Sequence, residues 1–143
     1  MNVETILAGK GRDVLTIAPD AVIADAVQLL GAKGVGAVVV SADGKKVSGI
    51  LSERDIVRGL SEHGGALLDR RIDDFMTRDV ETCTGRDTDQ EVLALMTERR
   101  FRHVPVVEDD VLVGIVSIGD VVKSRLDGIA SEAEAMRDYI SRG

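Results

Sequence analysis

The 143-residue sequence is poor in aromatic side chains, proline and cysteine, and each scarcity narrows what the chain can be. Aromatic residues make up 2% of the chain, so its core has to be built from aliphatic side chains, many of them β-branched and suited to strands. The single cysteine, Cys83, excludes an internal disulfide. Since there are only two prolines and no Gly/Ser/Pro tract, we expect an ordered domain.

Long apolar runs and an excess of positive charge are also missing. No stretch approaches the roughly 18 consecutive apolar residues of a membrane-spanning helix, and residues 1–13 lack a signal-peptide pattern. The formal net charge of −7 is not the basic footprint of a nucleic-acid-binding protein, although a local basic cluster could hold a small anion. We therefore expect a cytoplasmic protein that binds neither membranes nor nucleic acids.

The chain contains an internal repeat, which appears when the sequence is shifted against itself. A shift of 66 residues places 14–16 (Val-Leu-Thr) over 80–82 (Val-Glu-Thr). Towards the end of each copy the shift becomes 65 residues, and both copies read Gly-Ile-aliphatic-Ser-x-x-Asp, at 49–55 and 114–120. Agreement at both ends of two segments seldom arises by chance, so the sequence predicts a tandem of one small unit.

Each copy is predicted to follow a β-α-β-β-α order. Apolar residues at helical spacing predict one helix from Ile23, ended by Gly31 and Gly34, and another that starts at a capping box of Thr88 and Glu91. Short apolar runs separated by turns predict strands and hairpins. The expected strands are 14–17, 36–40, 47–51, 80–83, 104–107 and 111–116, and the second helices are near 53–61 and 119–140.

Three segments follow from this division. We assign residues 1–66 to the first repeat with an N-terminal lead-in helix, 67–124 to the second repeat, and 125–143 to a C-terminal helix. The lead-ins at 3–7 and 72–76 also match loosely. Because one copy of roughly 60 residues would bury too little apolar surface to be secure alone, we expect an α/β (α+β) fold in which the copies pack sheet to sheet about a pseudo-twofold axis around one core.

This pattern resembles the CBS domain, named after cystathionine β-synthase. The resemblance rests on the duplicated Gly-aliphatic-aliphatic-Ser/Thr-x-x-Asp motif and on the Asp-x-Met-Thr lead-in at 74–77, and it extends from about Val3 to Val122. Two such domains in tandem resemble a stand-alone CBS pair, or Bateman module. The resemblance implies a sensor that binds AMP, ADP, ATP, NAD or S-adenosylmethionine as a regulatory ligand, needs no metal, and regulates another protein.

The duplicated motif supplies the candidate ribose-binding residues. The resemblance implies that Asp55 and Asp120 hold the ribose hydroxyls and that Ser52 and Ser117 help to hold ribose or phosphate. These residues also have a purely structural interpretation, as a first-turn carboxylate and an N-cap. The two interpretations are compatible, because the free N–H groups of a helix start also favour phosphate.

Arg102 and His103, just before the apolar run at 104–107, are the candidate phosphate-binding residues. The resemblance puts this pair at the cleft, and the Arg fork suits phosphate oxygens. Cations at a helix end that merely complement the helix dipole are the alternative. Because the first copy has Gly36 and Ala37 at the matching positions, we expect the two clefts to differ in phosphate affinity.

The resemblance places the base between the strand that opens a repeat and the first strand of its hairpin. Ordinary strand core is the alternative for Ile17 and Cys83. Gly85 in the second copy stands where the first has Pro19, which should loosen that loop and give the two pockets different shapes. The residues implied for the base pocket are Thr16, Ile17, Ala37, Thr82, Cys83 and Pro105.

The C-terminal helix carries a heptad-type stripe of apolar residues with alternating spacings of four and three. A helix packed on its own domain and a helix packed against a second subunit both fit this stripe. The resemblance favours a homodimer or a higher homo-oligomer. The stripe consists of Val122, Leu126, Ile129, Ala133, Met136 and Ile140.

The preferred hypothesis is therefore a regulatory module that binds an adenine nucleotide of the AMP, ATP or NAD type. It would signal energy or redox state to an unidentified protein through conformation or association. The alternative is a structural dimerisation module with vestigial clefts, favoured by Gly36, Ala37 and Gly85. An enzyme is disfavoured, because no Walker loop, Gly-x-Gly-x-x-Gly sequence, metal-ligand spacing or nucleophile with its base can be assembled.

Overall fold

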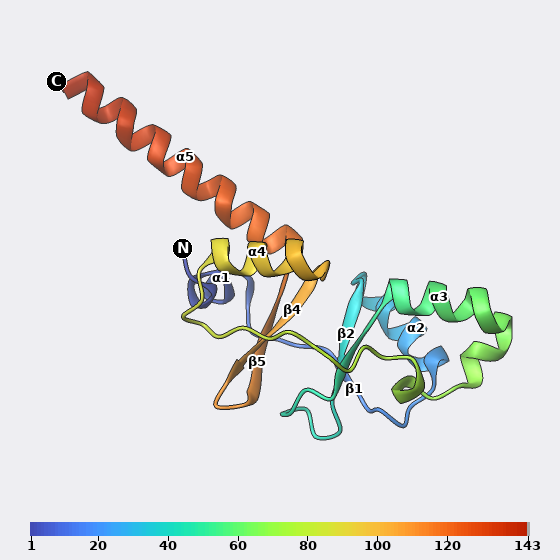
Figure 1. Cartoon of the computed structure of the whole chain (residues 1–143). Helices are drawn as coiled ribbons and strands as arrows, with labels where there is room; N and C mark the ends of the chain where they lie inside the picture. The colour runs from blue at the N-terminus through green and yellow to red at the C-terminus, as the bar shows by residue number, and fades with distance from the viewer. Residues whose placement is uncertain (143) are drawn as a thin grey trace.

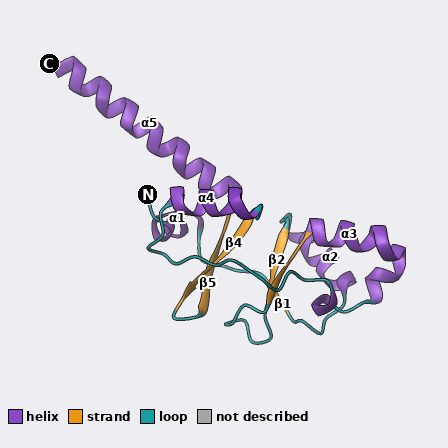
Figure 2. Ribbon diagram, viewed as in Figure 1, coloured by secondary structure: helices purple, strands orange, loops and turns teal. Residues whose placement is uncertain are grey.

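The computed structural model describes residues 1–142 and consists of two small mixed α/β units side by side, with a long helix projecting from the second (Figures 1 and 2). The predicted α/β fold with a C-terminal helix is confirmed. The chain begins with α1 (Val3–Lys10), and the 3₁₀ turns η1 (Gly64–Asp69) and η2 (Ile72–Asp74) join the units. The first unit contains β1 (Thr16–Ile17), α2 (Ile23–Lys33), β2 (Ala37–Val40), β3 (Gly49–Ser52) and α3 (Glu53–His63), and the second contains α4 (Asp89–Arg99), β4 (His103–Glu108), β5 (Val111–Ser117) and α5 (Ile118–Arg142).

The first unit is built on a three-stranded sheet in the order β1-β2-β3, with β1 parallel and β3 antiparallel to β2. All four residues of β2 are buried, as expected for the central strand. Helix α2 covers this sheet and buries Ile23, Ala26 and Leu30. It continues through Gly31 and ends at Gly34, whose left-handed φ of 63° favours glycine, so only the second of the two predicted helix stops is correct.

The second unit has a two-stranded sheet, because the strand expected at 80–83 is reduced to an isolated bridge between Cys83 and Val106. In the first unit the backbone N–H of Val39 donates to the carbonyl of Leu15, just before β1. The matching residue in the second unit is Pro105, which has no N–H to donate. One ladder hydrogen bond is therefore lost, and the strand does not extend.

Two separate clusters of buried side chains form the cores, one in each unit, so the expectation of a single shared core is wrong. Each core is completed by the lead-in that precedes the other repeat in sequence. Val3, Ile6 and Leu7 of α1 are buried in the second core, whereas Ile72 and Met76 are buried in the first. This exchange of lead-ins ties the two units together.

Backbone hydrogen bonds hold both lead-ins in the same way. The N–H of Asp73 donates to the carbonyl of Pro19 at 3.0 Å, and the N–H of Glu4 donates to the carbonyl of Gly85 at 3.0 Å. Gly85 is buried, and an added Cβ would lie 2.9 Å from the Glu4 carboxylate. Gly85 therefore lies directly beside α1, and the loosening of its loop stays a prediction.

A glycine of the motif lies under each exchanged lead-in. A Cβ added to Gly114 would come within 2.8 Å of the Leu7 side chain, and one added to Gly49 within 2.7 Å of the Met76 sulfur. These two glycines match each other in the repeat, as do Leu7 and Met76. The first residue of the Gly-Ile-aliphatic-Ser-x-x-Asp motif is thus needed for packing between the repeats.

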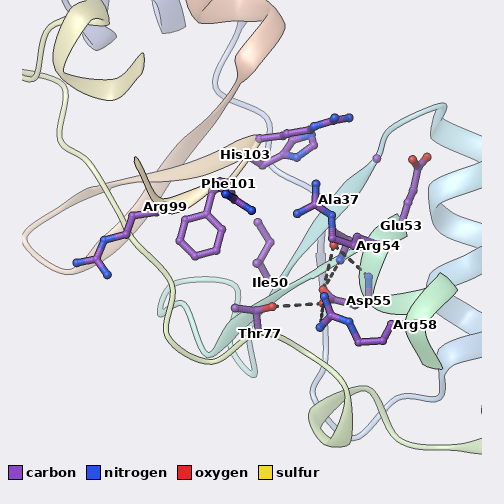
Figure 3. A pocket seen from close by; sticks show the side chains of 14 residues that line it. Ala37, Ile50, Glu53, Arg54, Asp55, Arg58, Thr77, Arg99, Phe101 and His103 are labelled. Atoms are coloured by element: carbon purple, nitrogen blue, oxygen red, sulfur yellow. Dashed lines mark hydrogen bonds and ion pairs between the residues drawn. The ribbon is translucent and has the colours of Figure 1, made fainter. Parts of the chain in front are cut away.

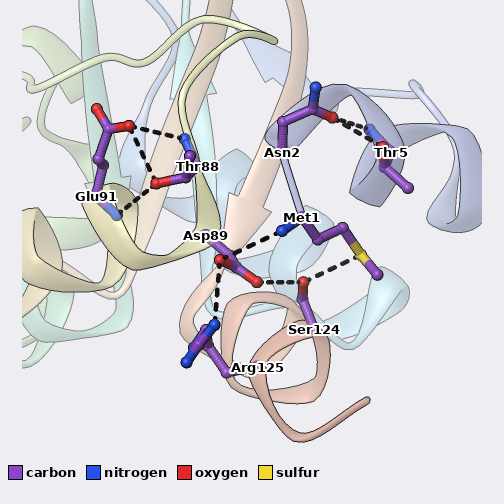
Figure 4. A network of polar contacts seen from close by, with 8 residues as sticks. All are labelled: Met1, Asn2, Thr5, Thr88, Asp89, Glu91, Ser124 and Arg125. Atoms are coloured by element: carbon purple, nitrogen blue, oxygen red, sulfur yellow. Dashed lines mark hydrogen bonds and ion pairs between the residues drawn. The ribbon is translucent and has the colours of Figure 1, made fainter. Parts of the chain in front are cut away.

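Helix α5 is anchored at its base by the buried carboxylate of Asp89 on α4, which is 2% exposed (Figure 4). Ser124 donates a 2.8 Å hydrogen bond to Asp89, and Arg125 lies 3.9 Å from it. Beyond this anchor the helix projects away from the body of the molecule (Figure 1). Among residues 1–142, no helix combines the length and apolar character needed to cross a membrane.

Candidate functional site

A cavity of about 340 Å³ opens between the two units, and we call it the Asp55 cleft (Figure 3). Its volume falls in the range of small-molecule sites. The first unit contributes the end of β3 and the start of α3, and the second contributes the loop from α4 to β4. The lining residues are Gly36, Ala37, Ile50, Ser52, Glu53, Arg54, Asp55, Arg58, Thr77, Arg99, Arg100, Phe101, Arg102 and His103.

Asp55 is fixed in this cleft by the N-cap of α3. Its Oδ2 accepts hydrogen bonds from the backbone N–H of Ser52 at 2.9 Å and from the Ser52 hydroxyl at 3.1 Å. The backbone N–H of Asp55 donates in return to the Ser52 hydroxyl, which completes a capping box. Its Oδ1 accepts a hydrogen bond of 3.4 Å from Thr77, and Arg58 lies 4.0 Å away. Because the Thr77 bond is long, Oδ1 keeps the capacity to accept from a ligand hydroxyl.

Arginines from both units surround the same cavity. Arg54 and Arg58 belong to α3, and the run from Arg99 to Arg102 enters from the second unit. The acids in the lining are Glu53 and Asp55, so the basic side chains outnumber the acidic ones. The cleft therefore combines an acceptor for hydroxyl groups with guanidinium groups that suit phosphate oxygens.

His103 stands in the wall between this cleft and a second one, and it lines both. Burial lowers the pKa of its imidazole, and the nearby charges of Lys10 and Arg102 lower it further, against the opposing effect of Asp120 and Glu53. The imidazole is therefore neutral at pH 7. Without a ligand it serves as a neutral hydrogen-bonding group rather than a cation.

The second cavity, of about 370 Å³, lies on the other side of His103, and we call it the Asp120 cleft. Ser117 caps α5 by accepting from the Asp120 N–H at 3.3 Å, and its own N–H donates to Asp120 Oδ2 at 2.8 Å. Ser117 lines this cavity together with Lys10, Asp13, Val14, Leu15, Ala37 and Ile115. Asp120 is not itself a lining residue, but it contacts two residues that are, Ser117 and Lys10. The two motifs thus build matching caps at two separate clefts.

The Asp120 carboxylate is already paired. The ammonium of Lys10 lies 2.6 Å from Asp120 Oδ2 and donates a second bond of 2.9 Å to the carbonyl of Ile115. Burial would raise the pKa of Asp120, but the hydrogen bonds from Lys10 and from the Ser117 backbone outweigh it and hold the pKa below its usual range. The two candidate ribose carboxylates therefore differ in their ion pairing, because the paired cation lies 2.6 Å from Asp120 but 4.0 Å from Asp55.

The structure brings several predicted site residues together. Ser52, Asp55, Ala37, Arg102 and His103 all line the Asp55 cleft, and Ser117 lines the Asp120 cleft. The contacts predicted for these residues with ribose and phosphate stay predictions.

Most of the predicted base-pocket residues lie away from the clefts. Thr16, Ile17, Thr82, Cys83 and Pro105 are outside the lining of both cavities described above, and their contacts with a base stay predictions. Cys83 is 4% exposed in the second core, and burial raises the pKa of its thiol to about 12. This thiol is therefore a packing group and not a nucleophile.

Several contributors were not predicted from the sequence, among them Ile50, Thr77, Phe101 and Lys10. Lys10 lies at the end of the first lead-in helix and Thr77 directly follows the second lead-in. Both reach their clefts because the lead-ins are exchanged, and no local sequence pattern predicts that exchange. The position of Arg58 beside Asp55 follows from the sequence, because the two residues are three apart and a helix brings such positions to one face.

The fold is a module of two related α/β halves, with a cavity beside the motif of each. The family model for the CBS domain matches the chain twice, at residues 10–62 and 72–127. The chain belongs to the CBS domain family, with two domains in tandem.

Relatives and solved structures agree with this assignment. The mitochondrial CBS domain-containing protein CBSX3 of Arabidopsis thaliana is 31% identical over 149 residues, covering 99% of this chain and 72% of the relative. The crystal structure of a CBS-domain containing protein from Agrobacterium tumefaciens is 46% identical, with a TM-score of 0.84 over 87% of this chain and 99% of that one.

Two further solved structures are described with adenosine compounds bound. The CBS domain pair of protein MJ0100, in complex with 5-methylthioadenosine and S-adenosyl-L-methionine, is 27% identical, with a TM-score of 0.76 over 88% of this chain and 98% of that one. CBSX2 in complex with AMP is 26% identical, with a TM-score of 0.68 over 80% of this chain and 88% of that one.

Proposed function

We propose that this protein is a regulatory module that binds a phosphorylated adenosine ligand in the Asp55 cleft. The observation that carries the proposal is the meeting of one buried carboxylate, Asp55, with arginines from both units around a cavity of about 340 Å³. The adenosine compounds bound by the MJ0100 pair and by CBSX2 support the adenosine class. AMP, ATP and NAD are the ligands that this charge pattern favours.

In this proposal each part of the ligand meets a different part of the cleft. The vicinal hydroxyls of the ribose donate to Asp55 beside Thr77. The phosphate lies towards Arg102 and His103 of the second unit, which both line the cleft. The base packs on the apolar side chains of Ile50 and Phe101, in place of the strand residues expected from the sequence.

Because the two units supply different groups, a bound ligand links them. A ligand changes the equilibrium between two arrangements only by its difference in affinity for them, and groups on two bodies provide such a difference. We infer that the protein reports energy or redox state through conformation or association to another protein. It acts in the cytoplasm as a binder rather than an enzyme, and the ligand is regulatory and needs no metal.

Self-association is the second part of the proposal. Beyond its anchor, α5 presents Leu126 at 60% exposure, Ile129 at 52% and Ile140 at 68%. An apolar stripe of this length on a projecting helix favours burial against another helix. We infer that the occupant is α5 of a second copy of the chain, giving a homodimer.

An antiparallel pairing of two α5 helices matches both shape and charge. With Leu126 of one copy opposite Ile129 of the other, Arg125 lies opposite Glu132 in a flanking position, and symmetry repeats each pair. Opposite charges at flanking positions are the pattern that sets partner and orientation in helix pairs. Arg125 also lies 3.9 Å from Asp89 of its own chain.

The ligand proposal is tested by calorimetry and thermal shift with adenosine, AMP, ATP, NAD and S-adenosylmethionine. A ligand that binds the folded state raises the unfolding midpoint by mass action. We expect phosphorylated ligands to bind the wild type and to lose at least about tenfold in affinity in Asp55→Asn, which corresponds to one lost hydrogen-bond partner. No shift with any adenosine compound would support the alternative, a dimerisation module with vestigial clefts.

A further inference from the structure

The two clefts receive different groups from their lead-ins. At the Asp55 cleft, the backbone of Thr77 pairs with Ile50 through hydrogen bonds of 2.8 and 3.0 Å, and the Thr77 hydroxyl reaches Asp55. Ile115 matches Ile50 in the repeat. At the Asp120 cleft, the carbonyl of Ile115 instead accepts from the side-chain ammonium of Lys10, which also binds Asp120.

The Lys10 ammonium therefore lies where a ligand would have to bind. A ribose hydroxyl approaching Asp120 brings a neutral donor in place of the Lys10 ammonium, which lies 2.6 Å away, so the attraction between two opposite charges would be lost. The pair is partly shielded, with side-chain exposures of 33% for Lys10 and 24% for Asp120. The exchange of ammonium for ribose is therefore unfavourable unless α1 moves.

Two anchors hold Lys10 in this position. Leu7, one turn earlier on α1, is fully buried against Gly114. The helix ends directly after Lys10 at Gly11, whose φ of 104° turns the chain into the segment that lines the cleft through Asp13 and Val14. A shift of the last turn of α1 would therefore move both the cation and the cleft wall.

We propose that Lys10 is a built-in competitor that keeps the Asp120 cleft closed to adenosine ligands. The protein then binds one ligand per chain at the Asp55 cleft, and the Asp120 cleft becomes available only when Lys10 leaves Asp120. This inference rests on the proposed function, because it assumes that the motif carboxylates recognise ribose. It gives the two repeats different tasks, one as the open site and one as a site controlled by α1.

The charges around the Asp120 cleft also predict what it binds once open. Without Lys10, the acids nearest the cavity are Asp13, which lines it, and Asp120, which is bonded to the lining residue Ser117, while His103 is neutral. Phosphate is disfavoured in such a setting. The opened cleft should therefore take an adenosine compound without phosphate, for which adenosine itself is the probe.

The experiment measures the number of adenosine sites per chain by calorimetry in the wild type, Lys10→Gln, Lys10→Ala and Lys10→Arg. We expect one site in the wild type and in Lys10→Arg, and two in both neutral variants. Adding Asp120→Asn to Lys10→Gln should return the count to one. Circular dichroism and the unfolding midpoint verify that each variant is folded, and Lys10→Gln, which keeps most of the side-chain length, serves if Lys10→Ala is unstable.

Failure of this inference can be told apart from failure of the proposed function. Two sites in the wild type, or one site in both neutral variants, would overturn the competitor role of Lys10 while leaving the Asp55 cleft intact. A loss of binding on neutralising Lys10 would also overturn it, since Lys10 would then be a ligand contact. Lys10→Gln in an Asp55→Asn background isolates the Asp120 cleft. If the wild type bound neither adenosine nor AMP, the proposed function itself would instead be refuted.

Discussion

The hydroxyl of Thr77 lies 3.4 Å from Oδ1 of Asp55 and donates a hydrogen bond to it. Asp55 belongs to the first repeat, and Thr77 belongs to the lead-in of the second. The proposed ribose carboxylate of one repeat is thus oriented by chain that belongs to the other. A ligand held at Asp55, as proposed, would therefore contact a carboxylate that is hydrogen-bonded to the segment connecting the two units.

Replacing Thr77 with valine should weaken ligand binding more than it weakens the fold. Valine keeps the shape and removes the hydroxyl that orients Oδ1, so we expect a loss of roughly threefold to tenfold in AMP affinity, in line with one modest hydrogen bond. Calorimetry measures the affinity and thermal unfolding the stability. Thr97→Val, on the exposed side of α4, is the control. An unchanged affinity in Thr77→Val would show that the hydroxyl has no part in ligand binding.

Replacing Arg102 with alanine should discriminate between phosphorylated and unphosphorylated ligands. A hydrogen bond to a charged group contributes about 1.5–3 kcal/mol, so AMP should bind about tenfold to a hundredfold more weakly while adenosine is nearly unaffected. Arg137→Ala, on the exposed part of α5, controls for the change in net charge. Equal losses for adenosine and AMP would refute the phosphate role of Arg102.

His103 should make AMP binding depend on pH. In the free protein its pKa lies below the ordinary 6.5 because of burial and nearby cations, and a bound phosphate would raise that pKa again. Binding then takes up a proton, and affinity should increase as the pH falls from about 7.5 to about 6.

The phosphate of AMP itself titrates near pH 6, so the comparison is with His103→Gln. The pH dependence of the wild type should exceed that of the variant, and identical profiles would exclude His103 as the proton acceptor. The stability of the unliganded protein should change in the opposite direction and decrease as the pH falls. Since the folded pKa of His103 is depressed, its contribution to stability is present above 6.5 and is lost as the pH falls below that value.

A charge in the α5 stripe should separate the proposed homodimer. Leu126→Asp places a carboxylate in the centre of the proposed helix pair, where burying it without a partner is costly. Light scattering after size-exclusion chromatography should give a dimer for the wild type and a monomer for the variant. Ser131→Asp, on the opposite side of α5, should stay dimeric. A monomeric wild type would rule out α5 as a dimer interface.

Asp89 should be essential for the anchoring of α5. It is 2% exposed and accepts from Ser124. Asp89→Ala leaves this buried hydroxyl only the weak acceptor Met1 Sδ and should cost about 1–3 kcal/mol of unfolding free energy. Denaturant unfolding measures this loss. Glu98→Ala, an exposed acid on the same helix, should change stability by less than about 0.5 kcal/mol. Equal effects for the two variants would contradict the anchoring role.

Local features of this protein were determined by its sequence. The capping box of Thr88 and Glu91 and the caps formed by Ser52 with Asp55 and by Ser117 with Asp120 all form as predicted. Such motifs are encoded by residues three apart, whose hydrogen bonds do not depend on the rest of the fold. For the same reason apolar spacing predicted the order of elements in both repeats, except for the opening strand of the second, which is reduced to an isolated bridge at Cys83.

Contacts between distant segments were decided only by the tertiary structure. The exchange of lead-ins, which brings Leu7 to Gly114 and Met76 to Gly49, joins residues that no periodicity connects. The pairing of Lys10 with Asp120 follows from that exchange. The motif alone made the two carboxylates equivalent, and packing makes them different, because the free energy of a charged group depends on what surrounds it in space.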